Sequence, residues 1–344
     1  MKAFFDDRQW DHNPKHFMAN GAISPNPEQP ERIAILQKGA VAAGCDFFRP
    51  DDAGLGPIAA IHSPQYLRFL QTIYHRWGHI KGGGTEVIPN VHPMNRTDSY
   101  PKSAVGQAGF HQADTACPIA EGTWNAAYWS AQSAIAGADT LIDGTHAAYV
   151  LSRPPGHHAF ADLAGGFCFL NNSAIAAERL RNRGFRPTIL DVDVHHGNGN
   201  QGIFYSRNDV FTVSLHANPE RFYPFFWGHS QEKGKDQGVG YNLNIPLERG
   251  TADDAYLQHL DLALKHIDDF GTDVLVVALG LDAFVDDPFK GLAITTKGFA
   301  RIAEAIKALN RPTLLVQEGG YICDALADNL TSFLDVFTAS PSAA

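Results

Sequence analysis

From Ala147 onward, short apolar runs alternate with longer segments whose apolar residues recur at the helical period. This alternation is typical of a three-layer α/β fold, in which helices cover both faces of a central, mostly parallel sheet. The expected strands are Ala147 to Leu151, Thr188 to Val194, Val210 to Leu215, Val274 to Leu279 and Thr313 to Val316. The expected helices are Ser173 to Asn182, Ala252 to Phe270, Thr296 to Leu309 and Asp324 to Phe337.

A polar segment follows each expected strand. These segments are Pro154 to His158, Asp193 to Asn198, His216 to Asn218, Asp282 to Asp287 and Glu318 to Tyr321. Open α/β sheets bind ligands at the carboxyl ends of their strands. We therefore expect the five segments to meet in one crevice.

The chain reads as one domain over residues 1–344, with a long insertion loop at about residues 73–118. That stretch contains Gly82 to Gly84, scattered prolines and little periodicity. Loops of such length in compact proteins are usually functional. We expect it to lie beside the substrate or to form a dimer interface.

Charge and cysteine content narrow the function classes. A net charge of −10 argues against sequence-independent nucleic-acid binding, which needs a basic face. The four cysteines are widely spaced and contain no C-x-x-C pair, which favours reduced thiols. There is neither a signal-peptide pattern nor an apolar run that could span a bilayer. A cytoplasmic protein with no membrane contact is expected.

The segment LDVDVHHGNG carries the strongest metal signal. Strand alternation places Asp191, Asp193 and His195 on one face. Two buried carboxylates beside an imidazole need protonation or a cation, although a solvated strand end is the plainer alternative. Asp282, where a second apolar run stops, would be the third ligand. Two carboxylates and an imidazole with an open position suit a catalytic Zn²⁺ or Fe²⁺.

Two further motifs offer catalytic groups. His157 and His158 follow a rigid Pro-Pro-Gly entry, and partners on their far nitrogens could keep one histidine basic and the other cationic. A purely structural or metal-binding pair is the alternative. Tyr321 follows two glycines, so its phenol could reach a developing oxyanion.

Taken in order, RPPGHH, DVDVHHGNG, SLH, LGLD and EGGY resemble the motifs of the histone deacetylase superfamily. Within it, GGFCFLNN, HHGNGNQGIFY, YPFFWG and the insertion before Gly122 are most similar to bacterial acetylpolyamine amidohydrolases. The resemblance implies an arginase-like fold around one zinc and a dimer. It also implies removal of acetyl groups from small acetylated amines such as acetylputrescine and acetylcadaverine.

The resemblance also implies residue roles. Asp193, His195 and Asp282 would bind the metal, and Tyr321 would stabilise the transition state. His158 would be the general base and acid and His157 an electrostatic stabiliser, with Asp191 and Asn198 as their partners. Structural potassium would bind at two sites, formed by Asp191, Asp193, His195 and Ser214, and by Phe204, Arg207, Val210 and Tyr241.

For the substrate, the resemblance implies a tunnel walled by Phe167, beside Gly166, and by Phe225 or Phe226. Phe167 stands where the amidohydrolases have a tyrosine. Asp114 occupies the place of a glutamate that recognises the distal ammonium, and its shorter side chain changes the reach.

Other functions are also compatible with parts of this sequence. A protein or peptide acetyl-lysine deacetylase would share the same metal chemistry. A ureohydrolase would bind two metals, and Asp286 and Asp287 are available, but the VHHG stretch lacks its extra ligand. The spacing of Gly197, Gly199 and Gly202 formally fits a dinucleotide fingerprint, although the nearby aspartates would repel a pyrophosphate. A non-catalytic module that binds acetylated amines would not need the intact set of ligands, histidines and tyrosine.

Overall fold

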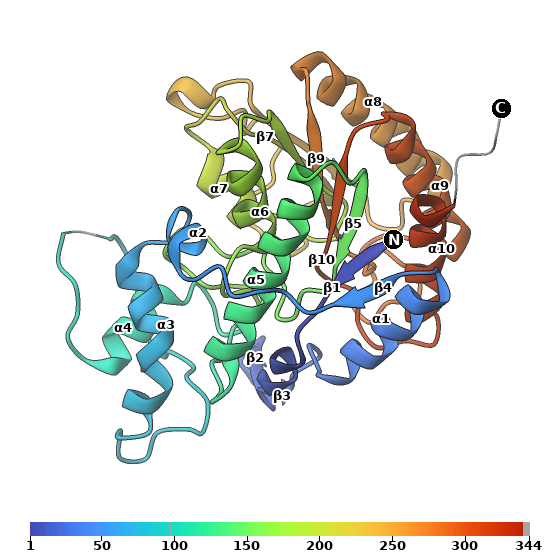
Figure 1. Cartoon of the computed structure of the whole chain (residues 1–344). Helices are drawn as coiled ribbons and strands as arrows, with labels where there is room; N and C mark the ends of the chain where they lie inside the picture. Colours follow the sequence, from blue (N-terminus) through green and yellow to red (C-terminus); the bar gives the residue numbers. More distant parts are fainter. Residues whose placement is uncertain (97, 340–344) are drawn as a thin grey trace.

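A computed structural model describes residues 1–96 and 98–339 of the chain (Figure 1). Within these residues eight strands form one sheet, and all neighbouring strands run parallel. From edge to edge they are β4 (Asp46–Phe48), β1 (Lys2–Phe4), β5 (Ala147–Val150), β10 (Thr313–Gln317), β9 (Val274–Leu279), β6 (Pro187–Asp191), β7 (Phe211–Ala217) and β8 (Asn242–Leu247). The expected α/β class and parallel sheet are confirmed.

Helices cover both faces of the sheet (Figure 1). One face carries α1 (Glu31–Ala42), α8 (Asp253–Phe270), α9 (Thr296–Ala308) and α10 (Leu326–Thr338). The other carries α3 (Pro64–Trp77), α5 (Thr123–Ile142), α6 (Asn172–Arg181) and α7 (Asn198–Phe204). The short helix α2 (Gly56–Ala59), α4 (Ala104–His111), the hairpin β2 (His16–Ala19) and β3 (Ala22–Pro25), and two 3-10 turns (Asp7–Asp11, Asp236–Gly238) complete the described elements.

Strand alternation divides the core into two layers. In β9, Leu275, Val277 and Leu279 pack with α1 and α8 to α10, whereas Val274 and Val276 pack with α3, α5 and α6. Every residue of β9 is buried, because helices cover both sides of the strand. The continuous apolar run in the sequence follows from this two-sided burial.

The region around residues 73–118 is more ordered than a loop. Helix α3 continues to Trp77, with Phe69, Ile73 and Trp77 buried at helical spacing. Helix α4 lies inside the expected loop and is capped by Ser103, whose hydroxyl accepts the Gly106 amide at 3.1 Å. The expectation of an irregular insertion is thus wrong for these two stretches. No helix among the described residues is long and apolar enough to cross a bilayer.

Candidate active site

Strand β6 ends at Asp191, three residues earlier than the alternation predicts. The carboxylates beyond this point bind nearby main-chain amides instead of continuing the strand. Asp191 Oδ1 accepts the Asp193 amide at 3.2 Å, and Asp193 Oδ1 accepts the His195 amide at 2.8 Å. Such local bonds compete with a strand ladder. The turn that results carries Asp193 and His195 toward the end of β9.

Asp193, His195 and Asp282 meet at this edge of the sheet, as the sequence predicts. Their ligating atoms lie within 4.8 Å of one another, and all three residues are buried. His195 Nδ1 lies 3.2 Å from Asp193 Oδ1 and 3.2 Å from Asp282 Oδ2. Ligands about 2.0–2.2 Å from a tetrahedral metal stand roughly 3.4 Å apart. The three residues therefore fit a small divalent cation and leave a coordination position free.

The electrostatics of the cluster point the same way. Burial raises the pKa of Asp282, and the negative charge of Asp193 raises it further. Burial also opposes ionisation of Asp193, but the His157 charge and the bonds from His195 hold the pKa of Asp193 well below its usual range. Burial lowers the pKa of His195, but bonds to the two carboxylates raise it to about 9. Protonation of His195 would thus offset the carboxylate charge that a bound cation would otherwise neutralise.

The two adjacent histidines have different partners. His157 Nδ1 lies 3.0 Å from Asp191 Oδ2, while His158 Nδ1 lies 2.6 Å from the amide oxygen of Asn198. Burial disfavours the charged form of His157, but Asp193 and Asp191 more than offset it and raise the pKa of His157 to about 10. Burial and the charges of His157 and His195 place the pKa of His158 well below 6.5. The surroundings therefore favour the cationic form of His157 and the neutral form of His158.

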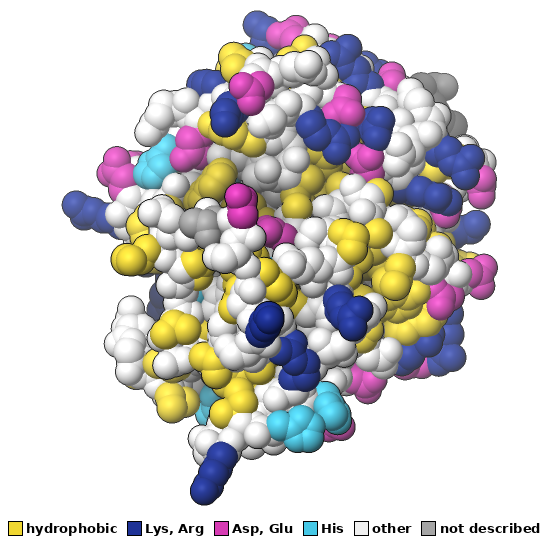
Figure 2. Space-filling view, turned by 90° about the vertical axis from the view of Figure 1, so that its left-hand side faces the viewer, with side chains coloured by type: hydrophobic (Ala, Val, Ile, Leu, Met, Phe, Trp, Pro, Cys, Tyr) yellow, Lys and Arg dark blue, Asp and Glu magenta, His cyan; other side chains and the backbone are white. Residues whose placement is uncertain are grey.

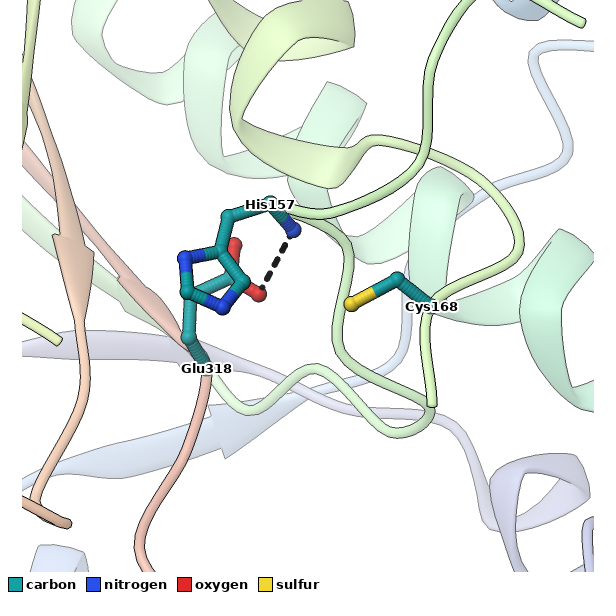
Figure 3. Close-up of side chains that lie close together, drawn as sticks. All are labelled: His157, Cys168 and Glu318. Carbon is teal, nitrogen blue, oxygen red and sulfur yellow. Dashed lines mark hydrogen bonds between the residues drawn. The ribbon is translucent and has the colours of Figure 1, made fainter. Parts of the chain in front are cut away.

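Glu318 binds the main chain of the turn that carries His157 (Figure 3). Its Oε2 accepts the Gly156 amide at 2.6 Å and the His157 amide at 3.0 Å, and its Oε1 accepts the Ser173 hydroxyl at 3.0 Å. His157, Cys168 and Glu318 also lie close enough to form a second candidate metal cluster. Burial raises the pKa of the Cys168 thiol well above 9, and the Glu318 oxygens already have donors. This group therefore fits a structural role.

A buried ion network supports the opposite side of the site. Arg32 donates to the carbonyls of Gly320 at 2.6 Å and Glu318 at 2.8 Å, which fixes the EGGY turn. Glu28 accepts from Arg32 at 2.6 Å and from Arg153 at 2.9 Å. The network joins the turn that carries Tyr321 to the turn that carries the histidines. Sequence reasoning did not identify Glu28, Arg32 or Glu318 as site residues.

Tyr321 lies beside the metal cluster. Its ring is 4.7 Å from that of Phe289 and 5.9 Å from that of Phe167, both in edge contact. Its main-chain amide donates to Asp287 Oδ2 at 3.0 Å. Burial, followed by the charge of Asp282, raises the pKa of Tyr321 well above 10. The phenol therefore keeps its proton and can donate to an oxyanion.

The aromatic rings beside the site differ in part from those expected to wall the tunnel. Phe167 is buried beside Tyr321, but Phe225 and Phe226 are 49% and 84% exposed. Tyr223, which the sequence analysis did not single out, takes the place expected for them, with its ring 5.0 Å from His158 and perpendicular to it. Asp114 bonds the Tyr223 hydroxyl at 2.6 Å.

The first site predicted for potassium shares Asp193 and His195 with the metal cluster. Asp191 and Ser214 line a cavity of about 10 Å³, room for one water-sized sphere. Asn200 Oδ1, on a residue that also lines this cavity, is buried without a hydrogen-bond partner. At the second predicted site, the Phe204 carbonyl accepts the Arg207 amide at 2.9 Å, and the Tyr241 carbonyl accepts the Thr212 amide at 3.2 Å, close to Val210.

The glycines that resemble a dinucleotide fingerprint have a packing explanation. A side chain at Gly197 would overlap the Asp191 carboxylate. A side chain at Gly199 would overlap the main chain of His157, His158 and Ala159. The glycines allow α7 to approach the histidine turn closely.

Comparison with known proteins identifies the arrangement. Residues 26–337 match the family model of the histone deacetylase domain. The chain belongs to the histone deacetylase family. It is 45% identical to the acetylpolyamine amidohydrolase of Burkholderia pseudomallei over 98% of this chain and 99% of that protein. It is 39% identical to the acetylpolyamine amidohydrolase of Mycoplana ramosa over 97% and 98% of the two chains.

A solved structure agrees with this membership. The crystal structure of the Burkholderia pseudomallei acetylpolyamine aminohydrolase superposes with a TM-score of 0.95 over 98% of this chain and 99% of that chain. The protein is a deacetylase, a hydrolase of the metal-dependent histone deacetylase family.

Proposed function

We propose that this deacetylase is a zinc enzyme that removes acetyl groups from acetylated diamines and polyamines, such as acetylputrescine and acetylcadaverine. The buried trio of Asp193, His195 and Asp282 beside the two histidines carries the metal part of the proposal. The substrate part draws on the names of the nearly full-length relatives. Fe²⁺ fits the same ligands and is the alternative metal.

A bound divalent cation would supply a Lewis acid that polarises the acetyl carbonyl and acidifies water. The chain supplies the proton transfers. Because the Asn198 oxygen accepts the Nδ1 proton of His158, the lone pair of that ring is on Nε2, where it can take a proton from water. The neutral state of His158 suits this role.

Two other groups stabilise charge. Cationic His157 is held by Asp191 and adds positive charge next to His158, at a ring separation of 4.0 Å. Tyr321 donates its phenol proton in a hydrogen bond to the oxygen that becomes negative as the amide carbonyl is attacked. The leaving amine then receives a proton from the histidine pair.

The direct test is acetate release by zinc-loaded protein from N-acetylputrescine, N-acetylcadaverine, N8-acetylspermidine and an acetyl-lysine peptide under one set of conditions. We expect the free acetylated amines to be preferred. A preference for the peptide would instead favour a protein deacetylase, and it would leave the assignments of Asp193, His157 and Tyr321 in place.

We also propose potassium at the two predicted positions. The small cavity at Asp191 and Ser214, with an unpartnered oxygen of Asn200 at its lining, supports the first. Main-chain carbonyls support the second. Thermal denaturation in KCl and in tetramethylammonium chloride tests both, since a structural ion raises the melting temperature.

We propose, thirdly, that the protein forms a homodimer through segment 73–118. Figure 2 shows the face formed by α2, α3 and α4, with hydrophobic side chains among the polar ones. Val91 is 50% exposed and Met94 is fully exposed on this segment, which supports an interface here. Light scattering of purified protein is the test. A monomeric mass in fully active enzyme would contradict it.

A further inference from the structure

The carboxylate of Asp114 is directed into the chain. Its Oδ2 accepts the Tyr223 hydroxyl at 2.6 Å and the Gly166 amide at 3.2 Å, and its Oδ1 accepts the Ala116 amide at 2.8 Å. A carboxylate offers about four lone-pair positions. Three are therefore filled by the chain itself, and the bond from the Tyr223 phenol is a short, charge-assisted one.

Tyr223 and Gly166, which both donate hydrogen bonds to Asp114, lie next to the catalytic histidine His158. The Tyr223 ring is perpendicular to the His158 imidazole at 5.0 Å and lies 6.1 Å from that of His195. Gly166 has a φ of 50°, and a side chain there would meet both His158 and the Tyr223 hydroxyl. The next residue, Phe167, has a φ of 68°, a conformation that costs a non-glycine residue free energy and needs support from its surroundings.

Asp114 is itself held in place. The Ala113 amide donates to the Ala164 carbonyl at 2.7 Å, and the Phe167 amide donates to the Ala116 carbonyl at 3.2 Å. These two bonds flank Asp114 and fasten the segment after α4 to the Gly165–Gly166 turn. The carboxylate thus has a fixed place from which to align two walls of the substrate path.

We propose that Asp114 is a positioning residue, which fixes Tyr223 and the Gly166–Phe167 turn against His158, and that it does so for every acetylated amine whatever its distal charge. This inference rests on the proposed amine deacetylase function. It differs from the expectation that Asp114 recognises a distal ammonium, because the Tyr223 hydroxyl and the two amides occupy its oxygens.

A double-mutant cycle separates the two roles. The proteins are wild type, Asp114→Ala, Tyr223→Phe and the double variant. The substrates are N-acetylputrescine and N-pentylacetamide, which has the same length but ends in a methyl group. We expect either single change to lower kcat/KM roughly tenfold, the scale of one hydrogen bond to a charged group, chiefly through kcat and equally for both substrates. The double variant should be no worse than the poorer single variant.

A loss in Asp114→Ala confined to the charged substrate would overturn the proposal, as would losses that multiply in the double variant. Tyr223→Phe removes one hydroxyl and keeps the ring, so it provides a reading even where Asp114→Ala folds poorly. Thermal denaturation checks each fold. Wild-type protein that releases acetate from neither compound would contradict the proposed function instead. In that case the affinities of the four proteins for the two compounds, measured by calorimetry, replace kcat/KM in the double-mutant cycle.

Discussion

His158 Nδ1 lies 2.6 Å from the amide oxygen of Asn198, whereas the equivalent atom of His157 lies 3.0 Å from a carboxylate oxygen of Asp191. The two histidines are neighbours in sequence and their rings are 4.0 Å apart. Their opposite pKa shifts follow largely from surrounding charge, since both are buried to the same extent. Because its partner Asn198 is neutral, His158 stays an unprotonated base next to the positively charged His157.

Asn198→Asp tests this division of roles. An added carboxylate favours the imidazolium form of His158 and so raises its pKa. The acid limb of the kcat/KM profile should therefore move to higher pH, by roughly one unit or more. The control is Asn310→Asp, which adds the same charge on an exposed residue before the amino end of β10, whereas the site lies at the carboxyl ends of the strands. An unmoved acid limb in Asn198→Asp would exclude His158 as the titrating base.

Tyr321→Phe should lower turnover about a hundredfold or more, because a positioned donor to an oxyanion contributes about 3 kcal/mol to barrier reduction. The phenyl ring keeps the contacts with Phe289 and Phe167, so folding should be unaffected. Single-turnover kinetics with saturating enzyme measures the chemical step directly. Near-normal turnover would remove Tyr321 from the mechanism.

The sequence identifies the metal cluster because strand ends are visible in it. Asp193 and His195 follow one apolar run and Asp282 ends another, and parallel strands bring such ends together. The histidine pair and Tyr321 are recognisable for the same reason. The short strands β1 and β4 and the edge strand β8, which contains Pro246, carry too weak a pattern to be predicted.

The supporting residues could not be predicted in this way. Glu28, Arg32 and Glu318 act through contacts with chain segments more than a hundred residues away, which no local pattern reveals. The choice between Tyr223 and its neighbours Phe225 and Phe226 depends on the path of one loop. The aromatic composition of YPFFWG indicates a wall, but the backbone decides which ring faces His158.

Metal binding should depend on the absence of a side chain at Gly319. A Cβ there would overlap the carboxylates of Asp282 and Asp193, both proposed ligands. We expect Gly319→Ala to weaken zinc affinity roughly 10- to 100-fold, the range found when groups around a ligand are altered. Competition with a chromogenic chelator measures it.

The control for this change is Gly56→Ala in α2, where a Cβ meets no atom within 4 Å. It should bind zinc as wild type does. Elemental analysis of the same samples should give one zinc per chain. Two metals per chain would instead favour the ureohydrolase chemistry that Asp286 and Asp287 left open, and equal affinities in the two variants would contradict the steric argument.

Acid should destabilise the fold through buried neutral histidines, of which His62 is the clearest case away from the metal. His62 Nε2 accepts the Asn171 amide at 2.9 Å, and its Nδ1 faces the Ala161 carbonyl at 3.3 Å. Burial lowers its pKa to about 4. The His62 imidazole takes up a proton near pH 6.5 in the unfolded chain but not in the folded chain. The contribution of His62 to the free energy of unfolding is therefore complete above that pH and falls as pH drops toward 4.

Glutamine can accept and donate the same two bonds without titrating. In His62→Gln the free energy of unfolding should therefore fall less steeply between pH 6.5 and 4, by up to about 1.4 kcal/mol per pH unit. Urea titrations across this range measure the slope, with His79→Gln, at an exposed histidine, as the matched control. Parallel slopes for wild type and His62→Gln would mean that His62 takes up its proton at the same pH in the folded and unfolded chains. The acid sensitivity would then have to come from other buried histidines, such as His12 and His216, whose pKa values are lowered by burial to about 3 and about 4.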